Sequence, residues 1–423
     1  MNVLLLTYGT RGDVQPFVAL GVELKERGHD VTLATSTRFE DFVRDHGLGF
    51  SALSDEMLAV LDTPEGKVIV ESTRTILDSL RLNLRFARRI GPMLRRQAED
   101  SWVAAQACAP DIVIFHPKGF AGPMLAEAFG CPAVLALTFP MMVPTGERPH
   151  LGFPSLPLGS AYNCMTHRLV NALATRAMKG PLKDSRRRHG LPPAKRHDVL
   201  HAADGRRLPS LTTISPSVVP EPGDWTSNDR MIGYWFLNDG NAVRLPDEVE
   251  AFLNGGPPPV YVGFGSMAGK APERLGRLVV EALRRAGKRG ILATGWGGLA
   301  GHETSDSILT VESVPHGALF PRVTAVVHHG GAGTTASGLR AGVPTVVVPF
   351  MGDQPFWGAR VEALGVGPKA IPQKKLTVES LARAIGRATE DAGIRERSAA
   401  LGERIRREDG VGETCRFVEG LGA

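Results

Sequence analysis

The chain has 423 residues, of which 43% are hydrophobic and 22% are charged. This composition excludes intrinsic disorder and supplies enough apolar side chains for two or three domain cores. The net charge of +5 is too small for this length to indicate a nucleic-acid-binding protein, but it suits an anionic small ligand. The four cysteines are scattered without metal-ligand spacing, and no apolar run reaches the ~20 residues that span a bilayer, so a cytoplasmic location is predicted.

The first 35 residues predict a strand, a Gly-rich loop, a helix and a second strand. The apolar run VLLLTYG is typical of a strand buried on both faces, and the loop GTRGDVQ follows its carboxyl end. Pro16 is interpreted as part of the first helical turn, and Gly28 ends the helix before the strand DVTLAT. Because open α/β sheets bind ligands at the carboxyl ends of their strands, this loop is a candidate site.

The alternation continues with strands at 111–116 and 132–138 and a helix at 122–129. A segment rich in Pro, Met and Phe, roughly 139–160, is then too broken for regular structure, and loops of this length are usually functional or disordered. Its apolar side chains predict an adaptable surface for a hydrophobic ligand, with a loop packed on its own domain as the alternative. The residues concerned are Phe139, Met141, Met142 and Phe153.

Residues 81–96 form a strongly basic segment with six arginines and no acidic residue. A solvated helix face is the plain interpretation of this pattern. A basic amphipathic helix that touches an anionic membrane surface transiently is the alternative.

A second strand–helix series follows a Pro- and Gly-rich stretch, 216–259, which we interpret as the interdomain linker. Its predicted strands are 260–266, 290–295, 325–330 and 345–350, and its predicted helices are 272–287 and 334–341, with a helix-rich stretch from 378 to 421. The predicted domains are therefore 1–215 and 260–400, with 401–423 as a C-terminal helix that returns to the first domain. Two such series predict two doubly wound α/β domains facing each other across a cleft.

The motif with the clearest chemistry runs from 325 to 357. A buried strand enters a Gly-rich turn that opens a helix, where backbone N–H groups and the helix dipole favour a phosphate. Gly331 and Gly333 would let the backbone approach that anion, and His329 and Thr334 would add hydrogen bonds. A plain Gly-rich turn with a capping threonine is the alternative interpretation.

The sequence of this motif resembles that of a known family. HGGAGTT followed by PxxxDQ resembles the donor-binding motif of inverting GT-B glycosyltransferases of family 1, in particular the sterol and glycopeptide-antibiotic branch. The stretches GTRGDVQPFVALGVELKERGHDVTLAT, FHPKGFAGPMLAEAFGCPAV, IGYWFL and GVGPKAIPQKKLT resemble the same branch, in the expected order. The resemblance implies the GT-B fold of two Rossmann-like domains, a nucleotide sugar as co-substrate, no further cofactor, and a small-molecule acceptor.

The resemblance also assigns donor-binding residues. The diphosphate would lie against His329, Gly331, Gly333 and Thr334, and the sugar hydroxyls against Asp353 and Gln354, a pair that could equally cap a helix. Ser266 would reach a phosphate and Trp296 would stack on the base. Thr10, Gly12 and Val314 complete the predicted donor set.

Asp13 is the predicted catalytic base, because the sterol and glycopeptide branches place an aspartate where many family members carry a histidine. A carboxylate with an ordinary pKa of about 4 is ionised at neutral pH and can accept the proton of an acceptor hydroxyl. A structural role as a cap of the following helix is the alternative. The chain has no D-x-D motif, so paired carboxylates that hold a divalent ion are not expected and no metal requirement is predicted.

The predicted reaction is the inverting transfer of a hexose to a hydroxyl of a lipophilic acceptor such as a sterol or polyketide. UDP-glucose is the favoured donor. Because Ser337 stands where the family often carries a ribose-binding glutamate, a dTDP-deoxysugar remains the alternative. A sugar-nucleotide epimerase, a non-catalytic sugar-nucleotide-binding scaffold and a dinucleotide oxidoreductase are the alternatives of other classes. The chain lacks the G-x-G-x-x-G spacing around Gly263 and Gly265, which argues against the oxidoreductase.

Overall fold

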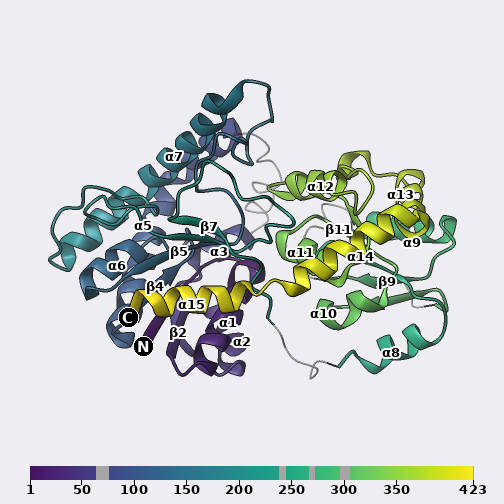
Figure 1. Ribbon diagram of the computed structural model, residues 1–423, viewed down its shortest axis with the longest axis horizontal. Coiled ribbons are helices and arrows are strands. Elements are labelled where there is room, and N and C mark those ends of the chain that lie inside the picture. Colours follow the sequence, from purple (N-terminus) through teal and green to yellow (C-terminus); the bar gives the residue numbers. More distant parts are fainter. Residues whose placement is uncertain (63–75, 238–243, 266–271, 296–304, 423) are drawn as a thin grey trace. The chain divides into compact units, whose positions relative to one another are not determined.

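The computed structural model describes residues 1–62, 76–237, 244–265, 272–295 and 305–422, with side chains throughout except at 61–62 and 76–89. The chain divides into two compact units (Figure 1). Unit 1 comprises Met1–Asn238 and Asp409–Ala423, and unit 2 comprises Asp239–Glu408.

Unit 1 is built on a parallel sheet with the strand order β3-β2-β1-β4-β5-β6-β7. Its strands are β1 (Asn2–Leu6), β2 (Asp30–Ser36), β3 (Gly49–Leu53), β4 (Ile112–Phe115), β5 (Ala133–Leu137), β6 (Ser210–Thr212) and β7 (Asp229–Met231). The order changes direction between β1 and β4, which are paired with Val3 opposite Ile112. This is the topological switch point, where doubly wound sheets bind ligands.

Helices cover both faces of this sheet, as the continuous apolar run of β1 predicts. Leu4 and Leu6 point into one core, and Val3 and Leu5 point into the core on the opposite face. The helices are α1 (Arg11–Glu26), α2 (Glu40–Asp45), α3 (Glu56–Asp62), α5 (Ile76–Cys108), α6 (Gly122–Phe129), α7 (Gly159–Arg188) and α15 (Gly410–Gly422), with a 3₁₀ turn η1 (Thr37–Phe39).

Unit 2 repeats the architecture with the parallel strand order β10-β9-β8-β11-β12. Its strands are β8 (Val260–Gly263), β9 (Gly290–Ala293), β10 (Ile308–Val311), β11 (Ala325–His328) and β12 (Thr345–Val347). Its helices are α8 (Asp247–Asn254), α9 (Pro272–Arg285), α10 (His316–Leu319), α11 (Ala332–Ala341), α12 (Gln354–Ala363), α13 (Val378–Glu390) and α14 (Ala392–Arg407), with turns η3 (Phe320–Arg322) and η4 (Gln373–Lys375). The switch point lies between β8 and β11.

The segment 216–259, which we expected to be a linker, carries regular structure of both units. Strand β7 pairs with β6 in the sheet of unit 1, and α8 packs Val249 and Leu253 into a core of unit 2. Likewise, α14 belongs to unit 2, whereas α15 packs Cys415 and Val418 into a core of unit 1.

The start of the first helix also differs from expectation. We placed Pro16 in the first turn, but α1 begins at Arg11 and Pro16 lies one turn further in. The helix begins earlier because Thr10 and Asp13 cap its N-terminus, which satisfies N–H groups that would otherwise have no partner.

Among the described helices, none is both long and apolar enough to cross a bilayer.

Candidate functional site

Asp13 lies just beyond the carboxyl end of β1, in the first turn of α1. Its Oδ2 accepts hydrogen bonds from the backbone N–H of Thr10, at 2.8 Å, and from the Thr10 hydroxyl, at 3.2 Å. The bond from the Thr10 N–H is one half of a capping box, whose other half joins the Asp13 backbone N–H to the Thr10 side chain, so the capping role that we considered as an alternative is present in the structure. Capping is only part of the role of this carboxylate, because two other groups contact it from the end of the neighbouring strand β4.

The second group at this carboxylate is Lys118, which follows β4. Its Nζ lies 2.9 Å from both carboxylate oxygens of Asp13. A glycine makes this approach possible: a Cβ on Gly9, whose φ is +141°, would lie 2.2 Å from Asp13 Oδ2 and 2.8 Å from Lys118 Nζ. Gly9 is therefore required by the ion pair as well as by the turn.

The third group is the imidazole of His116, which is fully buried at the end of β4. Its Nδ1 accepts a hydrogen bond from the backbone N–H of Lys118 at 3.2 Å, so the ring hydrogen lies on Nε2. That nitrogen is 3.3 Å from Thr138 Oγ1 and 3.8 Å from Asp13 Oδ1. Burial lowers the pKa of His116 to about 3, so the ring is neutral at physiological pH.

We call Asp13, Thr10, His116 and Lys118 the Asp13 site. Burial acts to raise the pKa of Asp13, but Lys118, followed by His116 and the N–H of Thr10, outweighs it and holds that pKa below its ordinary value. A carboxylate oxygen accepts about two hydrogen bonds. Oδ2 already receives those of Thr10 and one from Lys118, whereas Oδ1 receives only one, from Lys118. Oδ1 is therefore the oxygen with capacity to accept a further proton.

In unit 2, the turn between β11 and α11 forms the second candidate site, which we call the glycine-loop site (residues 328–334). Gly331 is the N-cap of α11, and no side chain caps this helix. The hydroxyl of Thr335 donates to the carbonyl of Gly331 at 2.9 Å, so it turns back into the helix. The first-turn N–H groups are left for an external anion, and the predicted residues Gly333 and Thr334 occupy that turn.

The imidazole of His329 lies over this helix start. A Cβ on Gly331 would be 2.6 Å from His329 Nε2, and one on Gly265, after β8, would be 3.4 Å from the ring. Within the described residues, His329 Nδ1 is buried without a hydrogen-bond partner. Burial lowers the pKa of His329 to about 4, so the ring is a neutral donor or acceptor at physiological pH.

The backbone of this turn is held by Gly330. Its N–H donates to His328 Nδ1 at 2.9 Å. Its φ is +92°, and a Cβ there would lie 2.8 Å from Val347 Cγ1 and 3.1 Å from the carbonyl oxygen of Gln354. Only glycine fits this position without moving β12.

Asp353 and Gln354 begin α12 at the end of the loop that follows β12. Gln354 Oε1 accepts hydrogen bonds from the backbone N–H groups of Phe350 and Met351, at 2.7 and 3.1 Å. Asp353 Oδ2 accepts one from Trp357 Nε1 at 2.7 Å. Both side chains thus shape the loop, and their contacts with a sugar remain a prediction.

The other predicted donor residues differ in exposure, and two of them are not described by the structure. Thr10 and Gly12 are exposed at the start of α1. Val314 is half-buried after β10, against a core of unit 2. Ser266 and Trp296 lie outside the described residues.

The residues predicted to bind the acceptor differ in exposure, and their contact with an acceptor stays a prediction. Met142 is buried in a core of unit 1, because the chain after β5 turns inward there, so it cannot line a surface in this conformation. Phe139, Met141 and Phe153 are half-buried. Phe139 lies near the Asp13 site, with its ring centroid 6.4 Å from that of His116.

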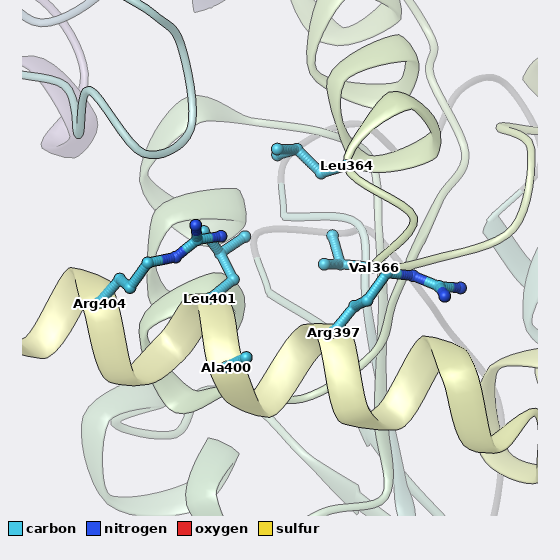
Figure 2. Close-up of a pocket in the computed structure, with 6 residues that line it drawn as sticks. All are labelled: Leu364, Val366, Arg397, Ala400, Leu401 and Arg404. Atoms are coloured by element: carbon cyan, nitrogen blue, oxygen red, sulfur yellow. The ribbon is translucent and has the colours of Figure 1, made fainter.

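A pocket of about 370 Å³ lies elsewhere on unit 2, between α14 and the end of α12. Figure 2 shows Leu364 and Val366 above the helix, with Arg397 and Arg404 on either side. None of the predicted site residues lines it. Within the described part of the chain, no group of three His, Cys, Asp or Glu side chains could hold a metal ion.

Comparison with known proteins gives matches in both units. Residues 3–144 match the glycosyltransferase family 28 N-terminal domain, and residues 300–411 match the C-terminal domain of erythromycin biosynthesis protein CIII-like proteins. The sterol 3-beta-glucosyltransferase UGT80A2 of Arabidopsis thaliana is 35% identical, over 97% of this chain and 64% of that protein. The sterol 3-beta-glucosyltransferase of Emericella nidulans is 37% identical, over 99% of this chain and 30% of that protein. The chain thus spans less than two thirds of the length of these relatives.

Solved structures resemble the chain over its whole length. The glycosyltransferase of kitacinnamycin aligns with a TM-score of 0.72 and 20% identity, over 100% of this chain and 99% of that one. Glycosyltransferase VinC in complex with dTDP aligns with a TM-score of 0.69 and 20% identity, over the same shares. The predicted fold class, two parallel-sheet Rossmann-like domains of the GT-B kind, is confirmed, and so is the resemblance to the sterol and antibiotic branch of these glycosyltransferases.

Proposed function

We propose, from its homology with the sterol 3-beta-glucosyltransferases, that the chain is a glycosyltransferase that moves a hexose from a nucleotide sugar to a hydroxyl of a lipophilic acceptor. The observation that carries this proposal is Asp13, a buried carboxylate held ionised at the switch point of unit 1 with capacity on one oxygen. Such a group can remove the proton of an acceptor hydroxyl as that hydroxyl attacks the anomeric carbon.

The reaction follows as a single displacement. The acceptor oxygen forms a bond to the anomeric carbon, the bond from that carbon to the diphosphate breaks, and the hydroxyl proton passes to Asp13 Oδ1. Attack from the face opposite the diphosphate inverts the anomeric configuration. Lys118 keeps the carboxylate ionised before the transfer, and His116 fixes the β4 loop that carries Lys118.

The glycine-loop site is suited to the leaving diphosphate. Uncapped N–H groups at the start of α11 and the neutral ring of His329 supply hydrogen bonds without a metal ion. We therefore propose metal-independent transfer, which the lack of a D-x-D motif supports.

UDP-glucose is the proposed donor, because relatives that match 97% and 99% of this chain are named sterol 3-beta-glucosyltransferases. A dTDP-sugar is the second candidate. The match of residues 300–411 to the erythromycin-type C-terminal domain favours it, since that range includes the glycine-loop site.

The experiment is a calorimetric titration with UDP, dTDP and NAD in the presence of a chelator, followed by assay of UDP-glucose consumption with and without a mixture of sterols and polyketides. Tight UDP binding with acceptor-dependent consumption is the expected result. Consumption without acceptor would indicate an epimerase or hydrolase, preference for dTDP would select the second donor, and binding of NAD alone would refute the proposal.

A further inference from the structure

The outer face of α7 has an apolar stripe where a helix in water would be polar. Six large hydrophobic side chains are exposed in the described residues, and four of them lie between 156 and 169. Leu158 is 61% exposed, Met165 51% and Leu169 41%. In Figure 1, α7 extends beyond the sheet of unit 1. The fourth side chain, Leu156, precedes the helix.

The helical repeat places these residues on one side. At 100° per residue, positions 158, 165, 169 and 172 fall within a narrow stripe, and positions 176, 183 and 187 continue the same stripe into the second half of the helix. The stripe is thus apolar in its first half and carries Arg176, Lys183 and Arg187 in its second half, all exposed. We call residues 156–187 on this side the α7 outer face.

The buried side of the same half-helix is polar, the reverse of a water-facing helix. Asn163 Nδ2 donates to the Gly146 carbonyl at 2.8 Å, and Asn171 Nδ2 donates to the Met142 carbonyl at 2.8 Å. His167 is buried between the carbonyls of Met141 and Arg148. Apolar side chains that face outward while polar ones face inward indicate an outer environment less polar than water.

The charge on α7 is predominantly positive. Asp184 is the only acidic residue of α7, and it lies 2.8 Å from Arg95 of α5 and 3.6 Å from Arg187. Among the described residues, no ion pair is formed by four exposed cations of the helix: Arg168, Arg176, Lys179 and Lys183. The pKa of the nearby His197 is lowered by burial and then by Lys183, Lys179 and Arg186, in keeping with a positive local potential.

We propose that the α7 outer face docks unit 1 on an anionic membrane surface. The apolar half enters the boundary of headgroups and acyl chains, and the basic half meets lipid phosphates. A second copy of the chain fits less well, because parallel pairing sets cation against cation and antiparallel pairing sets cations against the apolar half. Docking does not depend on the proposed reaction, but it would bring the domain that carries Asp13 to the phase in which lipophilic hydroxyl compounds dissolve.

Flotation of the full chain with vesicles tests the proposal. We expect binding to vesicles of phosphatidylcholine mixed with phosphatidylglycerol, little binding to phosphatidylcholine alone, and loss of binding at high salt. The double variant Met165→Glu with Leu169→Glu should lower the partition coefficient roughly tenfold or more. Lys179→Ala and Lys183→Ala should each lower it about fivefold. Val103→Glu is the matched control, because Val103 is 61% exposed elsewhere in unit 1.

A fluorescent reporter shows which face binds. Leu158→Trp should shift its emission to the blue only when anionic vesicles are added, and thermal unfolding should confirm that each variant folds. Unchanged binding of the double variant, or equal binding to neutral and anionic vesicles, would overturn the proposal. The proposal would also be overturned if the chain did not bind vesicles and instead formed a dimer that the same substitutions dissociate.

Discussion

The two strand-end sites of this molecule use different physical means to prepare for charge. The Asp13 site of unit 1 contains two side chains with formal charges, since its carboxylate is paired with Lys118 at 2.9 Å. The glycine-loop site of unit 2 is built from backbone N–H groups and a neutral imidazole, with no formal charge among residues 328–334.

The difference corresponds to the group that each site would bind: a proton at the Asp13 site and a diphosphate at the glycine-loop site. A group that takes up a proton must remain ionised before the reaction, so a fixed cation beside it is an advantage even though the cation weakens it as a base. A site for a bound diphosphate must attract an anion that arrives from water, and unpaired backbone dipoles provide that attraction without a counter-charge to displace.

The largest effect is expected from Asp13→Asn, which removes the base but keeps the shape of the side chain. Turnover should fall by ~10²-fold or more, while the affinity for UDP-glucose stays nearly unchanged, because the glycine-loop site is in the other unit. Steady-state kinetics and calorimetry measure the two quantities. Glu26→Gln, at an exposed position of α1, is the control, and wild-type turnover in Asp13→Asn would remove Asp13 from the mechanism.

Gly333→Ala separates ligand binding from folding in unit 2. No atom lies within 4 Å of the position of the added Cβ, so thermal stability should hold or rise slightly, as it does for alanine in a helix. The methyl group would stand where the diphosphate meets the first-turn N–H groups, and the affinity for UDP-glucose should fall about tenfold. Gly386→Ala in α13, equally open, is the control. Unchanged affinity in Gly333→Ala would mean that the anion binds elsewhere.

Lys118→Met tests the ion pair of the Asp13 site through its pH dependence. Because Lys118 lowers the pKa of Asp13, its loss should raise the pKa of the acid limb of the activity profile. Activity at low pH falls first, since the protonated carboxyl cannot act as a base. Lys118→Arg should restore most of the wild-type profile. An acid limb that does not move in Lys118→Met would contradict the role of this lysine.

His329→Gln should have the smallest effect, because a neutral ring contributes one hydrogen bond. The affinity for UDP-glucose should fall three- to tenfold, or about 0.5–1.5 kcal/mol. Burial lowers the pKa of His329 in the folded state to about 4, from the ordinary 6.5, so the ring is neutral above about pH 5. The wild-type affinity should therefore be flat between about pH 5 and pH 8. A rise in affinity below the ordinary pKa that His329→Gln abolishes would show a charged ring instead.

The fold was predictable where a pattern is long enough to show its period. The apolar run of β1 and the helical spacing of α9 predicted their elements. Strands β6 and β7, three residues each, are too short to show an alternation, so the stretch that contains β7 was interpreted as linker. The 30-residue helix α7 was not predicted, because Gly180 and Pro181 lie inside it and are sequence signals that normally end a helix.

The candidate site was predictable only in part, because the sequence shows local motifs but not contacts between distant segments. Asp13 and His329 follow strands in recognisable motifs, and their motifs were enough to single them out. His116 and Lys118 lie in a stretch that carries the same resemblance, yet nothing in it indicates a contact with Asp13, which is 105 residues away from Lys118.

By itself, the sequence determined the alternation of strands and helices, the two glycine turns, the family resemblance and the identity of the candidate base, since each depends on residues close together in the chain. Only the tertiary structure decided that Lys118 and His116 meet Asp13 and that the apolar stripe of α7 faces outward. The reason is that the order of strands in a sheet is set by the pairing and burial of distant segments. In this chain that order places β4 beside β1, and with it the lysine beside the carboxylate.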